Sequence, residues 1–379
     1  MNVLIVCNNA YMRGNGICTA VTSLLSRLKN AGIEARLLAY KNPETDGPQP
    51  DYPLKHFKFP LFEPIIYANG FRYAKADRKI IRKAVDWADI IHLSEGFPLE
   101  AITARIAKKA NKPCVGTYHL FSNNITTNLG MRKAILLNKA ITWYFRKSVY
   151  DHCKYIHCPS KTVADHLTES GFKAQMRIIS NGIDIIEENN LSKPSTNPIE
   201  IICIGRLANE KSQSTLLDAM RYSRYSNNIQ LHFAGKGPRK KSYEKSAEKL
   251  LKDGILKYRP TFGFYNYTEL RQLIKKAYLF VHCAWVEVEG LSCVEALMEG
   301  VVPIIAKSKL SASTQFALDS RSIFNAFDSK MLAEKIDWWI EHPEQRETMG
   351  KRYAESVKQY DSKISTANII KMYNECLGL

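Results

Sequence analysis

The chain has 379 residues, of which 45% are hydrophobic and 24% charged, and its formal net charge is +17. That length is too great for one ordinary core and suits two domains of about 180 residues each. The composition excludes a disordered or low-complexity protein, and no apolar run reaches the ~18 residues that a membrane span needs. The positive charge favours anionic partners: nucleotide phosphates, nucleic acid or an acidic membrane surface.

The cysteines and the N-terminus bear on where the protein works. None of the nine cysteines forms a Cys-x-x-Cys pair, and most lie inside apolar runs, which predicts buried reduced thiols instead of disulfides or zinc ligands. The first ten residues lack a basic region and predict a buried strand, not a signal peptide. We expect a cytoplasmic protein that is peripheral to a membrane at most.

Short β-branched runs alternate with longer amphipathic segments, the pattern of parallel sheets with crossover helices. Because the runs are almost continuously apolar, both faces of each strand should be buried. The predicted fold class is α/β, with two Rossmann-like doubly wound domains. The predicted strands are 3–7, 35–39, 89–93, 113–117, 155–158 and 177–180 in the first half, and 199–204, 229–234, 258–263, 279–283 and 302–306 in the second.

A polar segment, 187–198, separates the two halves and carries Pro194 and Pro198. It predicts a linker between an N-terminal domain, 1–186, and a C-terminal domain, 199–360. The remaining segment, 361–379, predicts a final amphipathic helix.

Gly14 and Gly16 follow the first predicted strand and open a helical pattern. Glycines there let the backbone approach a ligand, and the start of a helix offers free N–H groups to an anion. A dinucleotide-binding fingerprint would need a third glycine where Thr19 stands, and the acidic Glu34 begins a strand instead of ending one. A nicotinamide-dependent enzyme is therefore poorly supported, and a plain turn remains the alternative.

The segment Gly205-Arg206-Leu207-Ala208-Asn209-Glu210-Lys211 follows the predicted strand 199–204. The end of a strand is where doubly wound sheets bind ligands. Arg206 offers a bidentate fork and Lys211 a point charge, and two such cations can neutralise a diphosphate. The alternative is a solvated turn with no ligand.

About eighty residues later, Glu287 and Glu295 stand eight positions apart, and Gly290 and Leu291 open a helix between them. The backbone N–H groups at that helix start can meet an anion. Surface glutamates that stabilise the helix N-terminus are the alternative, which applies about equally to Glu287 and Glu289 and less to Glu295.

In this order and at this distance, the two motifs resemble the donor site of retaining glycosyltransferases of the two-Rossmann-domain type, family four. The resemblance covers nearly the whole chain; it is specific in 201–305 and looser in 1–190. It implies a GT-B-type fold, in which the two domains face each other across a cleft and the final helix crosses back onto the first domain. The implied enzyme is a hexosyltransferase that uses a nucleotide sugar as its co-substrate.

The resemblance also implies roles for single residues. Arg206 and Lys211 contact the donor diphosphate, Glu287 touches the donor sugar, Glu295 holds the ribose, and His119 contacts the sugar or the reacting centre. Before the resemblance is considered, a lone histidine at a strand end is more often structural. The donor-binding residues implied in this way are Gly14, Gly16, Gly235, Gly263, Phe264, Gly290, Leu291 and Glu295.

Retaining enzymes of this family are thought to react on the front face, where the leaving phosphate helps to take the acceptor proton. The sequence contains no Asp-x-Asp motif, so we expect no metal and no cofactor. Glu289 departs from the small or aromatic residue common in the family and is expected to add a charge beside the sugar pocket. The segment 308–322 departs from the usual glycine-rich loop, and the sequence gives it no purpose.

Two segments place aromatic residues beside basic ones, as an interfacial membrane anchor requires. The first, 57–83, ends in the basic residues of a predicted helix; the second, 131–154, contains a cluster of aromatics and cations. A core-packed helix with a solvated charged face is the alternative for each. The residues predicted to meet a membrane or its lipid are Arg78, Lys79, Arg82, Lys83, Trp143 and Arg146.

The sequence thus predicts metal-independent, retaining transfer of a hexose from UDP-glucose or UDP-galactose to diacylglycerol or a ceramide-type sphingolipid, on the inner face of an anionic membrane. One alternative acceptor is a surface polysaccharide or an undecaprenyl-linked oligosaccharide. A basic nucleic-acid-binding protein is the alternative from another class, but the sequence shows no RNA-recognition, KH or helix-turn-helix motif, so we expect no nucleic-acid partner.

Overall fold

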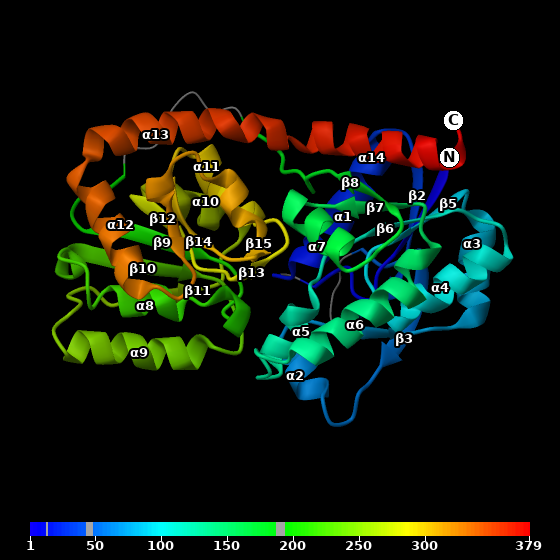
Figure 1. Ribbon diagram of the computed structural model, residues 1–379, viewed down its shortest axis with the longest axis horizontal. Coiled ribbons are helices and arrows are strands. Elements are labelled where there is room, and N and C mark those ends of the chain that lie inside the picture. Colours follow the sequence, from blue (N-terminus) through cyan, green and yellow to red (C-terminus); the bar gives the residue numbers. More distant parts are fainter. Residues whose placement is uncertain (13, 43–47, 187–193) are drawn as a thin grey trace. The chain divides into compact units, whose positions relative to one another are not determined.

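The computed structural model describes residues 1–12, 14–42, 48–186 and 194–379 (Figure 1). Contacts divide the chain into two compact units. Unit 1 comprises Met1–Asn181 and Lys363–Leu379, and unit 2 comprises Gly182–Ser362. The boundary at Asn181 lies before the expected end of the first domain at residue 186, and most of the predicted linker, 187–193, lies outside the described residues.

Unit 1 is built on a sheet whose described strands run in the order β4-β3-β2-β1-β5-β6-β7-β8. All neighbouring strands are parallel except β3 and β4. The strand order reverses at β1, so β1 and β5 flank the topological switch point, where such sheets bind ligands. The strands are β1 (Asn2–Val6), β2 (Glu34–Tyr40), β3 (Tyr52–Phe57), β4 (Tyr73–Lys75), β5 (Ile90–Leu93), β6 (Cys114–Thr117), β7 (Tyr155–Cys158) and β8 (Gln175–Ile178).

Unit 2 has a second parallel sheet, with its described strands in the order β11-β10-β9-β12-β14-β16, and its switch point lies between β9 and β12. A small separate pair, β13 and β15, stands outside that sheet. The strands are β9 (Ile199–Ile204), β10 (Ile229–Ala234), β11 (Thr261–Gly263), β12 (Leu279–His282), β13 (Val286–Glu287), β14 (Val302–Lys307), β15 (Leu310–Ser311) and β16 (Ile323–Asn325).

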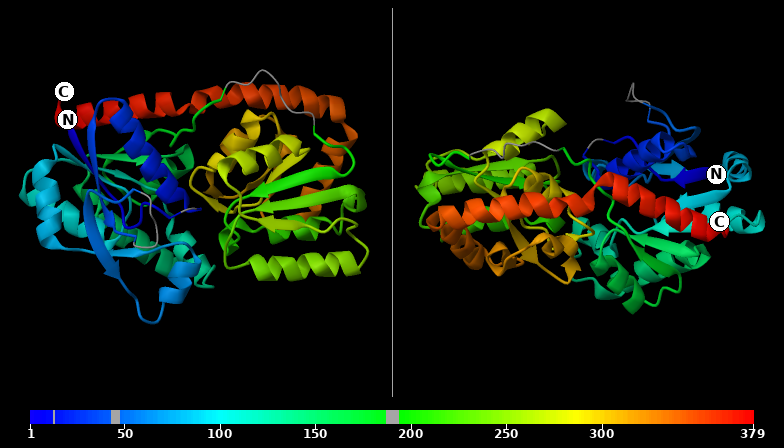
Figure 2. Two further views of the ribbon diagram at one scale, coloured as in Figure 1. Left: turned by 180° about the vertical axis from the view of Figure 1, so that it is seen from behind. Right: turned by 90° about the horizontal axis from the view of Figure 1, so that it is seen from above.

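Helices cover both faces of each sheet, as the doubly wound pattern predicts; in unit 2, α8 and α9 lie on one face and α10 and α11 on the other (Figures 1 and 2). The helices of unit 1 are α1 (Gly16–Asn30), α2 (Glu63–Ala68), α3 (Arg78–Trp87), α4 (Pro98–Lys109), α5 (Ser122–Asn128), α6 (Ile135–Ser148), α7 (Lys161–Glu169) and α14 (Ser362–Leu377). Those of unit 2 are α8 (Ser214–Ala219), α9 (Lys240–Lys252), α10 (Tyr267–Lys276), α11 (Leu291–Met298), α12 (Ser329–Glu341) and α13 (Pro343–Ser356).

The α/β prediction with two doubly wound sheets is confirmed, and the differences lie at the sheet edges. The strands β3, β4 and β16 were not expected, and neither was the separate pair β13 and β15. β3 and β4 occupy part of the segment interpreted as an aromatic anchor. β8 lies earlier than the predicted 177–180, and β11 is shorter than the predicted 258–263. Edge strands of three or four residues carry too little periodicity to be placed from sequence.

The central strands are buried along almost their whole length, which explains their continuously apolar sequences. In unit 1, α14 packs on the same core as α1 and β1 through Ile369, Met372, Tyr373 and Cys376. All nine cysteines lie within the described residues, and each is buried and free. None of the helices in the described part of the chain has both the length and the apolarity that crossing a bilayer requires.

Candidate active site

The two predicted donor motifs meet at the switch point of unit 2. Arg206 follows β9, Lys211 ends a short 3-10 turn, and Glu287 ends β13. Lys211 Nζ donates to Glu287 Oε2 although the two residues are 76 positions apart. The fold therefore joins the motifs through a direct ion pair.

His282, at the end of β12, is a second neighbour of Glu287 that the sequence analysis missed. It is buried, and its Nε2 lies 3.4 Å from the same carboxylate oxygen, Oε2. Burial alone would raise the pKa of Glu287, but Lys211 and His282 hold it below its ordinary value. Among the described residues no partner approaches Oε1, so that oxygen is available to a hydroxyl group of a ligand.

Arg206 is also held by a carboxylate. Its Nη2 donates to Glu210, which is fully buried, and its own carbonyl accepts from Gln213 Nε2 at 2.8 Å. The Arg206 and Lys211 side chains are only 23% and 21% exposed, so they are not freely solvated, and their contact with a diphosphate stays a prediction. The spacing of Arg206 and Glu210, four residues apart, was the sequence signal for this pair.

Glu295 differs from Glu287 in having no hydrogen bond or ion pair with any other described residue. It lies one turn inside α11, and burial raises its pKa to about 7. A largely desolvated carboxyl without a partner is poised to accept hydrogen bonds from an arriving ligand. The alternative of surface glutamates is wrong for its neighbour Glu289, which is 3% exposed.

Gly290 caps α11 in the left-handed region, with φ of 94°, and Leu291 begins the helix. A Cβ at Gly290 would lie 2.6 Å from Ser313 Oγ, so this turn requires glycine on two grounds. Ser313 belongs to the segment 308–322, whose β15 pairs with β13 and sets Ser311 opposite Glu287. The segment therefore supports the glutamate loop.

Glu289 does not lie on an open surface beside a pocket. Its side chain is buried, and it contributes, after burial itself, to raising the pKa of Tyr360. The residue lies in the interior of unit 2, and the expectation that it adds a charge beside the sugar pocket stays a prediction.

The loops after β10 and β11 complete this edge of the sheet. A Cβ on Gly235 would lie 2.0 Å from the Gly205 carbonyl oxygen, so the loops after β9 and β10 touch. Gly263 ends β11, and Phe264, which follows it, is 49% exposed. Lys236 Nζ lies 4.7 Å from the Phe264 ring centre, which sets a cation beside an exposed aromatic ring.

In unit 1, Gly14 and Gly16 flank the cap of α1. Gly14 has φ of 82°, and Asn15 Oδ1 accepts from the backbone N–H of Ile17 at 2.9 Å. Asn15 Nδ2 also donates to the Gly70 carbonyl at 2.9 Å. The side chain of Asn15 thus satisfies one of the free N–H groups at the start of α1. Binding of a donor anion at this helix start stays a prediction.

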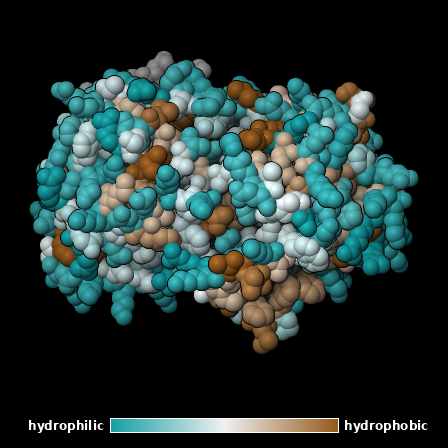
Figure 3. Space-filling view, viewed as in Figure 1, coloured by the Kyte–Doolittle hydropathy of each residue, from teal (hydrophilic) through white to brown (hydrophobic). Residues whose placement is uncertain are grey.

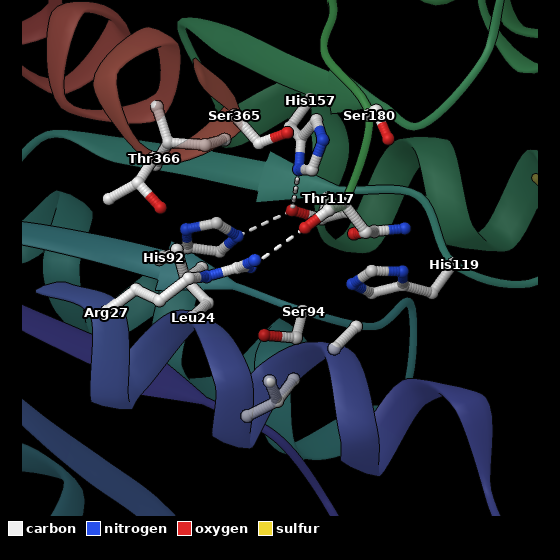
Figure 4. Close-up of a pocket in the computed structure, with 14 residues that line it drawn as sticks. Leu24, Arg27, His92, Ser94, Thr117, His119, His157, Ser180, Ser365 and Thr366 are labelled. Carbon is white, nitrogen blue, oxygen red and sulfur yellow. Dashed lines mark hydrogen bonds between the residues drawn. The ribbon is translucent and has the colours of Figure 1, made fainter. Parts of the chain in front are cut away.

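A directed hydrogen-bond chain crosses unit 1 beside His119, and Figure 4 shows its part around Thr117. His157 Nε2 lies 2.6 Å from the Ile179 carbonyl, which can only accept, so Nε2 carries the proton. His157 Nδ1 then accepts from Thr117 Oγ1 at 3.0 Å, and Thr117 accepts from His92 Nε2 at 2.6 Å. His92 Nδ1 finally accepts from Tyr373 Oη at 2.5 Å, which ties α14 to the sheet.

His119 follows β6 and lies near this chain, with its ring centre 6.4 Å from that of His157. Burial first, and then His157 and His92, lower its pKa well below the usual range, so its imidazole is neutral at physiological pH. The cavity that it lines with Arg27 and Ser365 measures about 10 Å³, close to the least space that one water molecule needs. His119 is thus a neutral donor or acceptor, and its contact with a sugar stays a prediction.

Two buried glutamates at the switch point of unit 1 were missed. Glu95, after β5, accepts from the Asn8 backbone N–H at 2.8 Å and from Asn8 Nδ2 at 3.0 Å. The same Nδ2 donates to Glu100 at 3.0 Å. Burial raises the pKa of Glu95 to about 7 and that of Glu100 well above its usual range. Their position after a strand end was the only sequence signal.

The residues predicted to meet a membrane divide into two kinds. Arg78, Lys79, Arg82 and Lys83 are all exposed on α3, and Trp143 is 58% exposed on α6. Arg146 instead donates to the carbonyls of Ser170 and Gly171 at 2.9 and 3.0 Å, at the end of α7. Arg146 therefore has a structural partner inside unit 1.

No cluster of three His, Cys, Asp or Glu side chains suited to a metal ion occurs among the described residues. Catalysis without a metal stays a prediction, since it concerns the reaction and not the fold.

Comparisons with known proteins decide the family. Residues 14–187 match the family described as Glycosyltransferase Family 4, and residues 184–356 match the family described as Glycosyl transferases group 1. The chain belongs to these family-four glycosyltransferases. As a member, the enzyme uses a nucleotide sugar as its donor.

The glycosyltransferase is 22% identical over 81% of its length to the Alpha-monoglucosyldiacylglycerol synthase of Streptococcus pneumoniae, of which it covers 71%. It is 23% identical over 80% of its length to the protein of the same name from Acholeplasma laidlawii, of which it covers 80%. Its fold is similar to that of Anabaena Alr3699/HepE in complex with UDP-glucose, with a TM-score of 0.73, 16% identity and coverage of 99% and 100% of the two chains. The fold is therefore of the GT-B type.

Proposed function

We propose that this glycosyltransferase moves glucose or galactose from its UDP-linked form to the hydroxyl group of a diacylglycerol or ceramide-type lipid. The transfer retains the anomeric configuration, needs no metal, and takes place on the inner face of a membrane to which the enzyme binds peripherally. The observation that carries the donor half is the switch point of unit 2, where the Lys211–Glu287 pair lies with the unpartnered Glu295.

Each group there has a proposed task. Glu295 accepts hydrogen bonds from the ribose diol, the exposed ring of Phe264 stacks on the base, and Glu287 Oε1 accepts from a sugar hydroxyl. Arg206 and Lys211 face the diphosphate. Because Glu210 and Glu287 hold these cations in place before the donor arrives, little reorganisation is needed when charge develops.

The reaction breaks the bond between the anomeric carbon and the diphosphate oxygen and forms the new bond to the lipid oxygen on the same face. The proton of the lipid hydroxyl passes to the leaving diphosphate oxygen. Positioning and stabilisation of the leaving charge supply the rate enhancement, without a protein nucleophile.

The acceptor half is supported by the two relatives named Alpha-monoglucosyldiacylglycerol synthase, at 22% and 23% identity. The switch point of unit 1 supports it too, because burial keeps Glu100 and the nearby histidines uncharged, which suits a neutral hydroxyl better than an ionic acceptor. The use of UDP is supported by the similar fold of a protein that binds UDP-glucose.

A radiolabelled transfer assay tests the proposal. Purified enzyme is mixed with UDP-glucose, UDP-galactose or GDP-glucose and with vesicles that contain diacylglycerol, ceramide or a sterol, with and without EDTA. We expect label from a UDP-sugar in the organic extract, unaffected by EDTA, with an α-linkage by NMR, and far less label with the Lys211→Ala variant.

Other outcomes would contradict one half of the proposal. Label that appears only as free sugar would retain the donor half and direct the acceptor search to an undecaprenyl-linked oligosaccharide or a polysaccharide. Transfer from GDP-glucose alone would replace the nucleotide. No turnover of any nucleotide sugar would sink the donor half.

A further inference from the structure

Helix α6 is inverted relative to an ordinary surface helix. Its buried residues are Asn138, Thr142, Phe145 and Ser148, three of which are polar. Its outward side exposes large apolar side chains instead, and Leu136 is 82% exposed. Because a surface helix in water normally turns its apolar stripe to the core, the outward side of α6 is suited to an apolar partner.

The inward polar residues of α6 are satisfied by α5, so this orientation is specified by the structure. Asn138 Oδ1 accepts from Thr126 Oγ1 at 2.9 Å, and Thr142 Oγ1 donates to Ser122 Oγ at 3.1 Å. Turning α6 to bury its leucines would break both hydrogen bonds and leave the buried hydroxyls of Ser122 and Thr126 without these partners. The exposure of the apolar side is therefore the state that the interior of unit 1 stabilises.

Helix α2 shows the same feature. None of its six residues is buried, although its sequence contains two isoleucines and a tyrosine. Leu61, just before the helix, is 85% exposed, and Phe62 is 51% exposed.

An aromatic series joins the region around α2 to α6. Ring centres are 4.8 Å apart for Phe57 and Phe59, 5.1 Å for Phe59 and Tyr73, 5.1 Å for Tyr73 and Phe97, and 5.5 Å for Phe97 and Phe145. Phe145 lies on the inward side of α6. In the projection of Figure 1, α2 is drawn next to α5 and α6.

Together these segments form one exposed surface, here called the apolar face and defined as the exposed apolar residues of 57–67 and 129–144. Of the fifteen large apolar side chains that unit 1 exposes among its described residues, twelve belong to it. Figure 3 shows apolar side chains gathered over the loop before α2 and over the α5–α6 region. Soluble monomers rarely gather apolar residues in this way without a partner.

The charges around the apolar face select the partner. The segments 55–75 and 129–147 contain nine lysines and arginines but a single acidic residue, Glu63, whose Oε1 lies 3.4 Å from Arg72 Nη1. Two copies of the chain meeting through this face would bring cation against cation. An anionic bilayer offers both an apolar interior and negative headgroups.

We propose that the apolar face docks unit 1 on the surface of an anionic lipid bilayer, with α2 and the start of α6 entering the headgroup region. This inference rests on the proposed lipid acceptor for its biological purpose, and it names the surface that would bring the enzyme to that lipid. Helix α3, whose four cations were predicted to anchor the protein, is fully described and carries none of the large exposed apolar side chains. Helix α3 therefore adds positive charge near the bilayer but has no large exposed apolar side chain to insert into it.

Vesicle binding without any nucleotide sugar or acceptor tests the docking by itself. Wild-type protein is expected to sediment with vesicles of phosphatidylglycerol and phosphatidylcholine, and to bind phosphatidylcholine alone far less. The double variant Leu61→Ser/Leu136→Ser should lower the binding constant at least about tenfold, because both side chains lose apolar area that the bilayer would bury. Ile178→Ser is the matched control, since Ile178 is 57% exposed in unit 1 but lies outside the apolar face.

Insertion depth gives a second readout that does not depend on variants of the leucines. Trp143 lies on the apolar face, so bromine-labelled lipids should quench its fluorescence in bound wild-type protein. The quenched fraction should disappear in Trp143→Phe, which removes the tryptophan but keeps an aromatic side chain at that position.

Three outcomes would overturn the proposal. Equal binding by wild type and the double variant would do so, as would an equal loss in the Ile178→Ser control. If the double variant instead turned a dimer into a monomer in sedimentation and bound vesicles normally, the face would be an interface between copies of this chain.

Transfer assays separate this inference from the proposed function. In the double variant, transfer to an acceptor in vesicles should fall, while transfer to a short-chain acceptor dispersed in detergent should keep the wild-type rate. Docking with no transfer in wild type would leave the apolar face in place and contradict the lipid acceptor. If the double variant transferred sugar to an acceptor in vesicles as well as wild type does, the docking role of the apolar face would be contradicted and the proposed function would not.

Discussion

The switch points of the two sheets have the same topology and opposite electrostatics. In unit 2 the charges are kept and compensated, by the pairs Lys211–Glu287 and Arg206–Glu210. In unit 1 burial suppresses charge: it raises the pKa of Glu95 to about 7 and lowers that of His157 to about 4. A doubly wound sheet therefore fixes where a ligand is met, while the residues after the strands fix which charge the ligand carries.

The difference fits the two substrates of the proposed reaction. A nucleotide sugar brings a diphosphate, which needs cations that are already in place. A lipid hydroxyl is neutral, and a site without fixed charge lets it keep its proton until the leaving group can accept it. Four predictions test this comparison, in order of decreasing expected effect.

Lys211→Ala is the most direct test of the charged switch point of unit 2. It removes one cation from the diphosphate and leaves Glu287 buried without its partner, so we expect kcat to fall by about a hundredfold to a thousandfold, the scale of one lost transition-state stabiliser. Steady-state kinetics with a UDP-sugar measure it. Lys351→Ala, on the exposed side of α13, is the matched control, and a wild-type kcat in the Lys211 variant would remove that lysine from the site.

Glu95→Gln tests whether the switch point of unit 1 is uncharged, through the pH dependence of the protein's stability. The folded pKa is raised from 4.5 to about 7, so the folded state favours the protonated carboxyl and stability is lost as pH rises through that range. The shift corresponds to about 3 kcal/mol. Wild type should lose about that much more unfolding free energy between pH 4.5 and pH 8 than Glu95→Gln does, measured by denaturant unfolding. The histidines are common to both proteins, but Glu95 itself helps to raise the pKa of Glu100, so the difference between the two curves reports the pair. Parallel curves would show that Glu95 is not neutral in the fold.

Glu295→Ala tests the exception in unit 2, a half-buried carboxyl that has no partner among the described residues. We expect UDP affinity to fall about tenfold, the effect of one or two lost hydrogen bonds to a charged group, while Glu295→Gln keeps an acceptor oxygen and loses less. Titration calorimetry compares the two variants with Glu347→Ala, an exposed control on α13. Unchanged UDP binding would end the ribose role of Glu295.

Replacing Arg78, Lys79, Arg82 and Lys83 by glutamine tests cations on α3 that belong to neither switch point. Since these side chains are exposed and screened by salt, we expect vesicle binding to weaken by about twofold to threefold at physiological salt, with UDP binding unchanged. A loss as large as that of Leu61→Ser/Leu136→Ser would make α3 an equal part of the docking surface.

The sequence predicted much of this molecule where local pattern and burial coincide. The apolar runs placed the central strands, such as β1 and β12, since a strand buried on both faces has no other composition open to it. The order of the motifs that contain Lys211 and Glu287, and the distance between them along the chain, were enough to suggest the donor site. Edge strands such as β4 were missed because three residues carry no usable period.

Only the tertiary structure decided which groups are charged and which surfaces are open. Glu289 and Glu295 stand six residues apart in one motif, yet one is turned into the interior and the other has no partner among the described residues. Likewise, the sequence of α6 does not show that Asn138 and Thr142 face inward and Leu136 outward, because that depends on the hydroxyls that α5 presents. Burial and pairing depend on residues far apart in the chain, so they are set when the sheet brings those residues together.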